Sequence, residues 1–256
     1  MKTINLPLYT LEKNALKDKT ILITGASRGL GREIALKAAE YGATTILLGS
    51  SLKKLESVYD VITENGWPEP ALQPMNFLGV GPKELEALAN SIESMFGKLD
   101  GLVHNAASVG QVCPLEVLPA QKWLQSIHVN LNIPFMLTHA LLPLLHKSTQ
   151  SSVIFTADND ASQPQAYWGA YHASKMGLKT LAETFMQELE STSIKVNTVY
   201  PPHLRTALRI NHFPGINPAE FTAPEAVAAD YVYLLQSLHH GQHFGLSAHN
   251  KTGVMA

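Results

Sequence analysis

A glycine-rich turn between an apolar strand and a helix most constrains what this chain can fold into. The stretch TILIT at 20–24 predicts a buried strand, and TGASRGLG at 24–31 follows it and opens a helix. Gly25 permits a tight turn, Gly29 lets the backbone approach a pyrophosphate, and Gly31 lets the helix pack close to the sheet. Because the helix amides would point at the phosphates, the pattern predicts a dinucleotide site, although such a turn can also form without a ligand.

Short apolar strands alternate with amphipathic segments along the rest of the chain. Apolar side chains recur at helical spacing over 137–145 and 178–185. The other predicted strands lie at 44–48, 71–75, 99–104, 152–156, 194–199 and 244–248. This alternation is typical of a parallel sheet covered by helices on both faces. We therefore expect a single doubly wound, Rossmann-type α/β domain over 1–256, with a mostly parallel seven-stranded sheet and an N-terminal arm at 1–18.

Composition excludes several function classes. A net charge of −2 and a pI near 6.6 argue against nucleic-acid binding, and no block of like charges supports docking to a membrane. The N-terminus is too polar for a signal peptide, and no apolar run reaches the ~18 residues that span a bilayer. The single cysteine, Cys113, fits a reducing compartment. We expect a cytoplasmic protein with a small-molecule substrate and no nucleic-acid or membrane partner.

Four histidines near the C-terminus raise the question of a metal site. They stand at positions 239, 240, 243 and 249 without a nearby cysteine or carboxylate in the sequence. Metal sites need convergent ligands that are held by further hydrogen bonds. We expect solvated histidines around a turn and no metal.

Tyr171 and Lys175, in the stretch YHASK, are separated by one helical turn and share a helix face. Reduction of a carbonyl by hydride transfer builds negative charge on oxygen, which must then receive a proton. A free tyrosine, with a pKa of ~10, is a sluggish proton donor near neutrality, and a nearby ammonium favours the tyrosinate. The pair predicts acid–base chemistry, although a YxxxK sequence can also arise by chance on an amphipathic helix.

The TGxxxGxG loop with YxxxK downstream resembles the short-chain dehydrogenase/reductase family, over about residues 18 to 250. Within that family, GREIAL, YGATTILLG, LDGLVHNA and YWGAYHASK resemble the YciK type of bacterial oxidoreductase. The resemblance implies hydride transfer between a nicotinamide and a carbonyl or alcohol, with Tyr171 as acid and base. It implies that Lys175 binds the nicotinamide ribose and promotes ionisation of the tyrosine, and that Asn130 helps to hold a water that links the lysine to solvent.

The end of the second predicted strand bears on the choice of cofactor. Dinucleotide sites for NAD carry an acidic residue here for the ribose 2′-hydroxyl, whereas this chain has Gly49 or Ser50. Arg28 could neutralise a 2′-phosphate, or it could be a solvated surface residue. We expect NADP(H) rather than NAD(H). The expected cofactor-binding residues, by resemblance, are Gly25, Ser27, Arg28, Leu30, Gly31, Ser50, Asn76, Phe77, Asn105, Ala106, Tyr171, Lys175, Pro201, Leu204 and Thr206.

Asp158 departs from the family pattern, because a serine that donates to the substrate carbonyl usually stands thirteen positions before the tyrosine. An ionised aspartate only accepts hydrogen bonds, and losing one oxyanion donor typically costs ~10²–10³ in rate. A protonated Asp158 could donate instead, Asp158 could bind a cationic or hydroxyl-rich substrate group, or the site could be impaired. A neighbour could also supply the donor; the candidates are Thr156, Asn159 and Ser162. The rival function is a non-enzymatic dinucleotide-binding protein, either a sensor of NADPH or an assembly partner.

Two further expectations come from the resemblance. The proline-interrupted stretch 203–222 falls where the family carries its substrate-covering loop, and long loops of this kind are often lids. Family members build dimer interfaces from helices that correspond to 123–146 and 167–190, so we expect a homodimer or homotetramer. Tyr167 and Trp168 precede the tyrosine of the YxxxK pair. They could line a substrate pocket or pack as ordinary aromatic residues.

Overall fold

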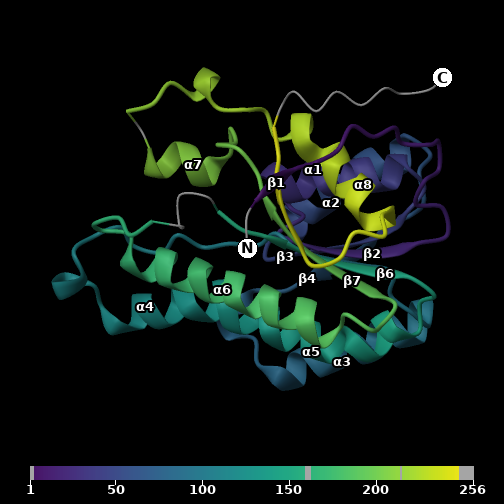
Figure 1. Cartoon of the computed structure of the whole chain (residues 1–256), viewed down its shortest axis with the longest axis horizontal. Helices are drawn as coiled ribbons and strands as arrows, with labels where there is room; N and C mark the ends of the chain where they lie inside the picture. Colours follow the sequence, from purple (N-terminus) through teal and green to yellow (C-terminus); the bar gives the residue numbers. More distant parts are fainter. Residues whose placement is uncertain (1–2, 159–162, 214, 248–256) are drawn as a thin grey trace.

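The computed structural model of this chain describes residues 3–158, 163–213 and 215–247, which form one α/β domain (Figure 1). Eight strands form a single sheet in the order β1-β8-β7-β6-β5-β2-β3-β4, and every neighbouring pair is parallel. The predicted doubly wound, Rossmann-type fold is confirmed. The predicted count of seven strands is wrong, because β1 (Ile4–Asn5), in the N-terminal arm, pairs with the last strand.

The remaining elements alternate as the sequence predicts. The strands are β2 (Thr20–Thr24), β3 (Thr44–Gly49), β4 (Ala71–Pro74), β5 (Gly101–His104), β6 (Ser151–Thr156), β7 (Ile194–Tyr200) and β8 (Gln242–Gly245). The helices are α1 (Gly29–Glu40), α2 (Leu52–Glu64), α3 (Pro82–Phe96), α4 (Ala120–Ile127), α5 (Ile133–His146), α6 (Gly169–Glu188), α7 (Ala207–His212) and α8 (Glu225–Gln236). A π-helical turn, His128–Asn132, joins α4 to α5. Short 3₁₀-helices lie at Phe77–Gly79, Leu115–Val117 and Pro218–Glu220.

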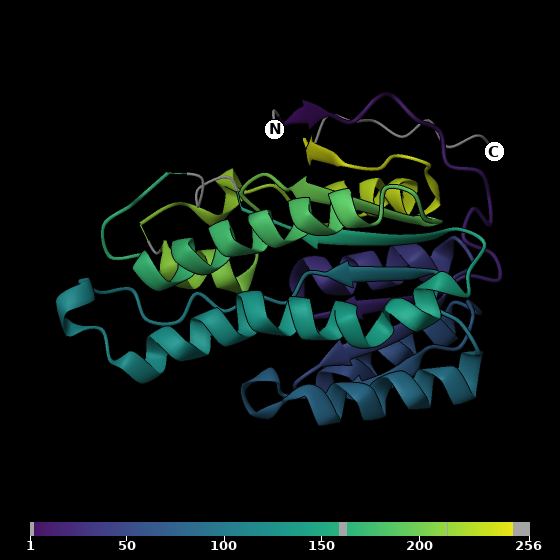
Figure 2. The same cartoon turned by 60° about the horizontal axis from the view of Figure 1, so that its bottom comes forward.

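Helices cover both faces of the sheet (Figures 1 and 2). Helices α1, α2 and α8 lie on one face, and α3, α4, α5 and α6 lie on the other. Each face has its own apolar core, which explains why the central strands read as continuous apolar runs. Strand β4 lies at the edge of the sheet, where Pro74 is tolerated because no further strand needs its missing amide hydrogen.

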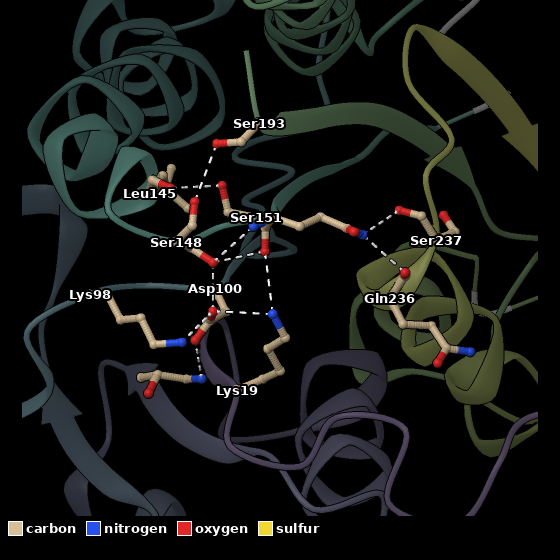
Figure 3. Close-up of polar contacts among 11 residues, drawn as sticks. Lys19, Lys98, Asp100, Leu145, Ser148, Ser151, Ser193, Gln236 and Ser237 are labelled. Carbon is tan, nitrogen blue, oxygen red and sulfur yellow. Dashed lines mark hydrogen bonds and ion pairs between the residues drawn. The ribbon is translucent and has the colours of Figure 1, made fainter.

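A polar network around Asp100 holds the end of the sheet from which β5 and β6 begin (Figure 3). The buried carboxylate accepts hydrogen bonds from Lys98 Nζ at 2.8 Å, Ser148 Oγ at 2.6 Å and the Thr20 amide at 3.0 Å. Burial alone would raise the pKa of Asp100, but these donors hold that pKa below its ordinary value. The network lies at the amino ends of the strands, so it supports the fold rather than a ligand site.

The late histidines are structural rather than solvated, which corrects the expectation from sequence. His240 Nδ1 accepts from the Val196 amide at 3.1 Å, and its Nε2 lies 2.7 Å from the Met186 carbonyl oxygen. His243 is buried in β8. His240 therefore pairs with backbone groups of β7 and α6, and His243 Nε2 lies 3.2 Å from Glu183 Oε1 of α6. No local sequence signal reveals these contacts. His249 lies outside the described residues.

Within the ranges given above, no group of three or more His, Cys, Asp and Glu side chains converges as a metal site would require. No helix in those ranges combines the length and the apolar character needed to cross a bilayer.

Candidate functional site

A cavity of about 680 Å³ opens at the carboxyl ends of the strands. The chain order reverses between β2 and β5, which are neighbours in the sheet, and the cavity lies over this point. Such a crevice is where doubly wound α/β proteins bind their ligands. The lining comes from the glycine loop, the ends of β3, β5 and β6, the start of α6 and the segment after β7.

Nearly all of the cofactor-binding residues expected from sequence line this cavity. Those at its wall are Gly25, Ser27, Arg28, Leu30, Ser50, Asn76, Phe77, Asn105, Ala106, Tyr171, Lys175, Pro201, Leu204 and Thr206. Gly31 does not line it and lies beneath the loop instead. Asp158 is also at the wall, whereas Asn130 is not. Their placement brings these residues together; their roles in binding stay predictions.

The glycine loop is built around close backbone approaches. Gly25 and Gly29 have positive φ angles, of 70° and 55°, that favour glycine. A Cβ atom on Gly31 would lie 2.3 Å from the Gly25 carbonyl oxygen, so no larger residue fits there without movement of the loop. No side chain caps the N-terminus of α1, which leaves its first amides available to an anion.

Thr24 joins the loop to the strand beside it. Its hydroxyl donates to the Val103 carbonyl oxygen at 3.2 Å and accepts from the amides of Asn105 at 2.9 Å and Ala106 at 3.0 Å. The Asn105 side chain donates in turn to the Thr24 carbonyl oxygen at 3.3 Å. These bonds fix the floor of the cavity where β2 and β5 end.

Tyr171 and Lys175 lie on the first turns of α6, and each is 5% exposed. The Lys175 ammonium donates to the Thr156 carbonyl oxygen at 3.1 Å and lies 6.0 Å from the centre of the Tyr171 ring. Burial lowers the pKa of Lys175 to about 8, and the charge of Asp158 opposes that shift. The lysine is therefore a buried cation near neutral pH, close to the tyrosine.

Asp158 lies two residues after the end of β6 and contacts Tyr171. The Tyr171 hydroxyl donates to Asp158 Oδ2 across 2.7 Å. The Thr156 hydroxyl forms a hydrogen bond with the Tyr231 hydroxyl at 3.1 Å, so it faces α8 rather than Tyr171. Asn159 and Ser162, the other candidate donors, lie outside the described residues.

Asn130 sits in the π-helical turn and is 1% exposed. Its amide nitrogen donates to the Ser108 carbonyl oxygen at 2.7 Å and to Ser174 Oγ at 2.9 Å, and its oxygen accepts from the Ser108 amide at 2.8 Å. The side chain thus ties the loop after β5 to α6, between Tyr171 and Lys175. The water-holding role that the resemblance implies stays a prediction.

The ionisable lining of the cavity is mainly positive. Four cations line it, namely Arg28, Lys175, Arg205 and Arg209, whereas Asp158 is the one carboxylate among the lining residues that the structure describes. Such a balance suits a ligand with several phosphate groups. Sequence reasoning missed Arg205 and Arg209, because they lie in a segment without strong periodicity.

The segment 203–222 contains a helix that the sequence did not predict. Thr206 caps α7 by accepting from the Arg209 amide at 3.4 Å. The Arg209 guanidinium lies 4.7 Å from the centre of the Phe213 ring, which stacks on Trp168 at 5.1 Å. Trp168 is buried in this aromatic group, whereas Tyr167 is 57% exposed. The segment therefore packs against the start of α6 beside the catalytic pair expected from sequence.

Comparisons with known proteins agree with this geometry. The short chain dehydrogenase family model matches residues 19–216. YciK of Escherichia coli K12, an uncharacterised oxidoreductase, is 38% identical over 227 residues, which cover 89% of this chain and 90% of that protein. A short chain dehydrogenase of Shigella flexneri 2a strain 301, solved with NADP, is 36% identical with a TM-score of 0.88, covering 91% of this chain and 99% of that chain. Another from Escherichia coli CFT073, solved with NADPH, is 37% identical with the same TM-score, covering 93% and 100%.

Proposed function

Since this chain belongs to the short-chain dehydrogenase family, we propose that it is an NADP(H)-dependent oxidoreductase acting on a carbonyl or alcohol substrate. Tyr171 is the proposed acid and base, and Lys175 its cationic neighbour. The observation that carries the proposal is that one cavity of about 680 Å³ holds the Tyr171 hydroxyl, a buried lysine and a glycine loop shaped to approach phosphates.

The cavity suits a phosphorylated dinucleotide. The uncapped amides of α1 would hold the pyrophosphate, and Asn76 and Phe77, both at the cavity wall, would contact the adenine. Arg28 and Ser50, both at the wall, would hold a 2′-phosphate, because the end of β3 carries no acid to repel it. The NADP and NADPH in the two solved relatives support the same preference. When bound, the nicotinamide gives or takes the hydride.

Side chains of the protein, Tyr171 and its neighbour Lys175, carry out the proton transfer. Tyr171 exchanges a proton with the substrate oxygen, and the Lys175 ammonium favours the ionised tyrosine by its charge. With a pKa of about 8, this lysine is mostly charged at neutral pH and loses its charge as the pH rises. The hydrogen bonds of Asn130 hold the loop after β5 against α6, which keeps Tyr171 and Lys175 in position.

A second candidate function rests on the Tyr171–Asp158 hydrogen bond. If the carboxylate abolishes proton exchange, the chain would be a dinucleotide-binding protein without turnover, a sensor or an assembly partner. The two candidates share cofactor binding and differ in catalysis.

The experiment pairs binding with turnover. Fluorescence titration would measure the affinity for NADPH and NADH, and cofactor absorbance would follow matched pairs such as cyclohexanol with cyclohexanone and 1-phenylethanol with acetophenone. The enzyme proposal expects binding with turnover, and a Tyr171→Phe variant that binds NADPH but does not turn over. Binding without any turnover would favour the second candidate. If neither nucleotide binds, both fail.

We also propose that the chain forms a homodimer or homotetramer through the helices that its family uses. Large apolar side chains are exposed on each of them, with Leu124 on α4 58% exposed, Phe135 on α5 48% and Met176 on α6 41%. Light scattering on a sizing column would report the mass, and a monomer at micromolar concentration would contradict the proposal.

A further inference from the structure

The hydrogen bond between Tyr171 and Asp158 has a defined direction. A carboxylate only accepts, so the single phenolic hydrogen of Tyr171 is the one shared across the 2.7 Å contact. The phenolic oxygen therefore presents lone pairs to any substrate oxygen that approaches from the cavity. A serine at position 158 would not impose this direction, because a hydroxyl both donates and accepts.

This direction distinguishes the two forms of a substrate. An alcohol O–H can donate to the phenolic oxygen, which continues the chain from substrate to Tyr171 to Asp158. A carbonyl oxygen only accepts, so it would meet lone pairs where it needs a donor. With the carboxylate ionised, the site thus matches an alcohol and disfavours a carbonyl.

Cationic side chains share the cavity with Asp158. Lys175 faces the site from α6, and Arg205 and Arg209 line the cavity from the segment after β7. Asp158 and Arg209 also line a smaller recess together with His172 and Trp168. Arg28 lines the cavity as well, so the charged and titratable side chains that the structure describes in these two recesses, besides Asp158 and Tyr171, are Arg28, Lys175, His172, Arg205 and Arg209.

From this geometry, and resting on the oxidoreductase function proposed above, we infer that Asp158 is a catalytic residue that takes up the proton released in alcohol oxidation. The C–H bond of the carbinol carbon breaks, and its hydride, with both electrons, goes to NADP⁺. The O–H bond of the alcohol breaks as its proton passes to the Tyr171 oxygen, while the Tyr171 proton passes to Asp158 Oδ2. The carbonyl forms, and Asp158, which is partly exposed, releases the proton to solvent.

The inference has a signature in pH dependence. If Asp158 holds the exchanged proton, oxidation is independent of pH across neutrality. The kcat/KM for reduction then falls about tenfold per pH unit, because reduction must first bring a proton from solvent onto the carboxylate. In Asp158→Asn the amide cannot take up a proton, so Tyr171 alone exchanges it. Reduction then becomes independent of pH in that range, and oxidation slows as the pH falls. Both profiles respect the equilibrium constant of the reaction, in which one proton is consumed by reduction.

The experiment compares the full-length protein with Asp158→Asn, Asp158→Ser and the control Asp60→Asn. The control removes the same charge from an exposed position on α2, away from the cavity. Rates in both directions would be measured with cyclohexanol and cyclohexanone between about pH 6 and 7.5, below the pKa of Lys175. In both Asp158 variants we expect the pH dependence to move from reduction to oxidation, so that reduction no longer changes with pH and oxidation does. In the control we expect both pH profiles to match those of the wild type. A wild-type reduction rate that is independent of pH would overturn the inference while leaving the oxidoreductase function intact.

A second readout needs neither cofactor nor turnover. Near-ultraviolet absorbance follows phenolate formation, and the band lost in Tyr171→Phe belongs to that residue. Since the carboxylate stabilises the protonated phenol, Asp158→Asn and Asp158→Ser should ionise Tyr171 at lower pH than the wild type does. An unchanged titration in both variants would contradict the contact on which the inference stands. Absent NADPH binding would instead remove the proposed function, and the inference with it.

Discussion

Tyr9, in the N-terminal arm, donates its hydroxyl to Asp230 Oδ1 in α8 across 2.5 Å. The other oxygen of this buried carboxyl has no hydrogen-bond partner among the described residues. The Tyr9 ring also stacks on Tyr233, with 4.3 Å between ring centres. The arm is therefore fastened to α8 by one phenol, which places a titratable group at the junction.

This junction predicts that stability falls as the pH rises from about 4 to 6. Burial raises the pKa of Asp230 to about 6, although the hydrogen bond from Tyr9 opposes the shift. A carboxyl whose pKa is higher in the folded state stabilises the fold below its unfolded pKa of ~3.9, and this contribution is lost as the pH rises through the folded value. A rise of the Asp230 pKa from ~3.9 to about 6 corresponds to a loss of about 3 kcal/mol in the free energy of unfolding.

Urea unfolding at several pH values would measure this effect in the wild type and in Asp230→Asn. The variant has no carboxyl to ionise, so its stability should change less between these pH values. The control is Asp60→Asn, which removes an exposed carboxylate from α2. If the wild type and Asp230→Asn show the same pH dependence, the folded carboxyl does not titrate as stated.

How much the sequence could predict depends on how local each signal is. Strand β2 was predicted with the bounds that the structure has, because five consecutive residues are buried on both faces of the sheet. Strand β1 was missed, since its two residues are exposed and pair with β8 at the far end of the chain. Helix α7, with six residues, is too short for periodicity to reveal.

The candidate site likewise combines features that local sequence signals predict with features that depend on the fold. Helical spacing predicted that Tyr171 and Lys175 lie together, and the family resemblance placed Asp158 beside them, at the position of the family serine. The contact between the Tyr171 hydroxyl and Asp158 could not be predicted, since it depends on the path of the chain after β6. Arg205 and Arg209 reach the cavity through the fold of the segment after β7, for which the sequence holds no periodic signal.

We predict that Ser50→Asp changes the cofactor preference from NADPH towards NADH. The new carboxylate would stand at the end of β3, where it repels a 2′-phosphate and can accept from a 2′-hydroxyl. The ratio of NADPH to NADH affinity should fall at least about tenfold, which corresponds to ~1.4 kcal/mol. Fluorescence titration with both nucleotides measures it.

Removal of Arg28 should weaken NADPH binding and leave NADH binding nearly unchanged. Arg28 lines the cavity, whereas Lys53, on α2, is exposed and does not line it. Lys53→Ala therefore controls for the loss of a surface cation. Equal weakening of both nucleotides in Arg28→Ala would show that the guanidinium does not bind the 2′-phosphate.

Gly31→Ala tests the packing of the glycine loop. The added Cβ would meet the Gly25 carbonyl oxygen at 2.3 Å and the Asn105 side chain at 2.6 Å, so the loop must move. Overpacking of this kind costs about 1–3 kcal/mol, and we expect NADPH binding to weaken by more than tenfold. Gly79→Ala is the matched control, because a Cβ there meets nothing within 4 Å. Thermal melting and NADPH titration would separate the loss of stability from the loss of binding, and wild-type behaviour of Gly31→Ala would refute the close approach.

Lys175 predicts that NADPH affinity falls as the pH rises through about 8. Burial lowers the pKa of this lysine to about 8, so its positive charge is present below that pH and disappears above it. The charge adds to the positive lining of the cavity, which attracts a phosphorylated dinucleotide, and it stabilises the tyrosinate form of Tyr171. In Lys175→Met the affinity should be low throughout, with no step near this pH. Lys179→Met, four residues further along the same helix, controls for the loss of a lysine that does not line the cavity. NADPH titrations from about pH 6.5 to 9.5 would follow the step, and a wild-type affinity that stays constant over this range would contradict the role given to the charge.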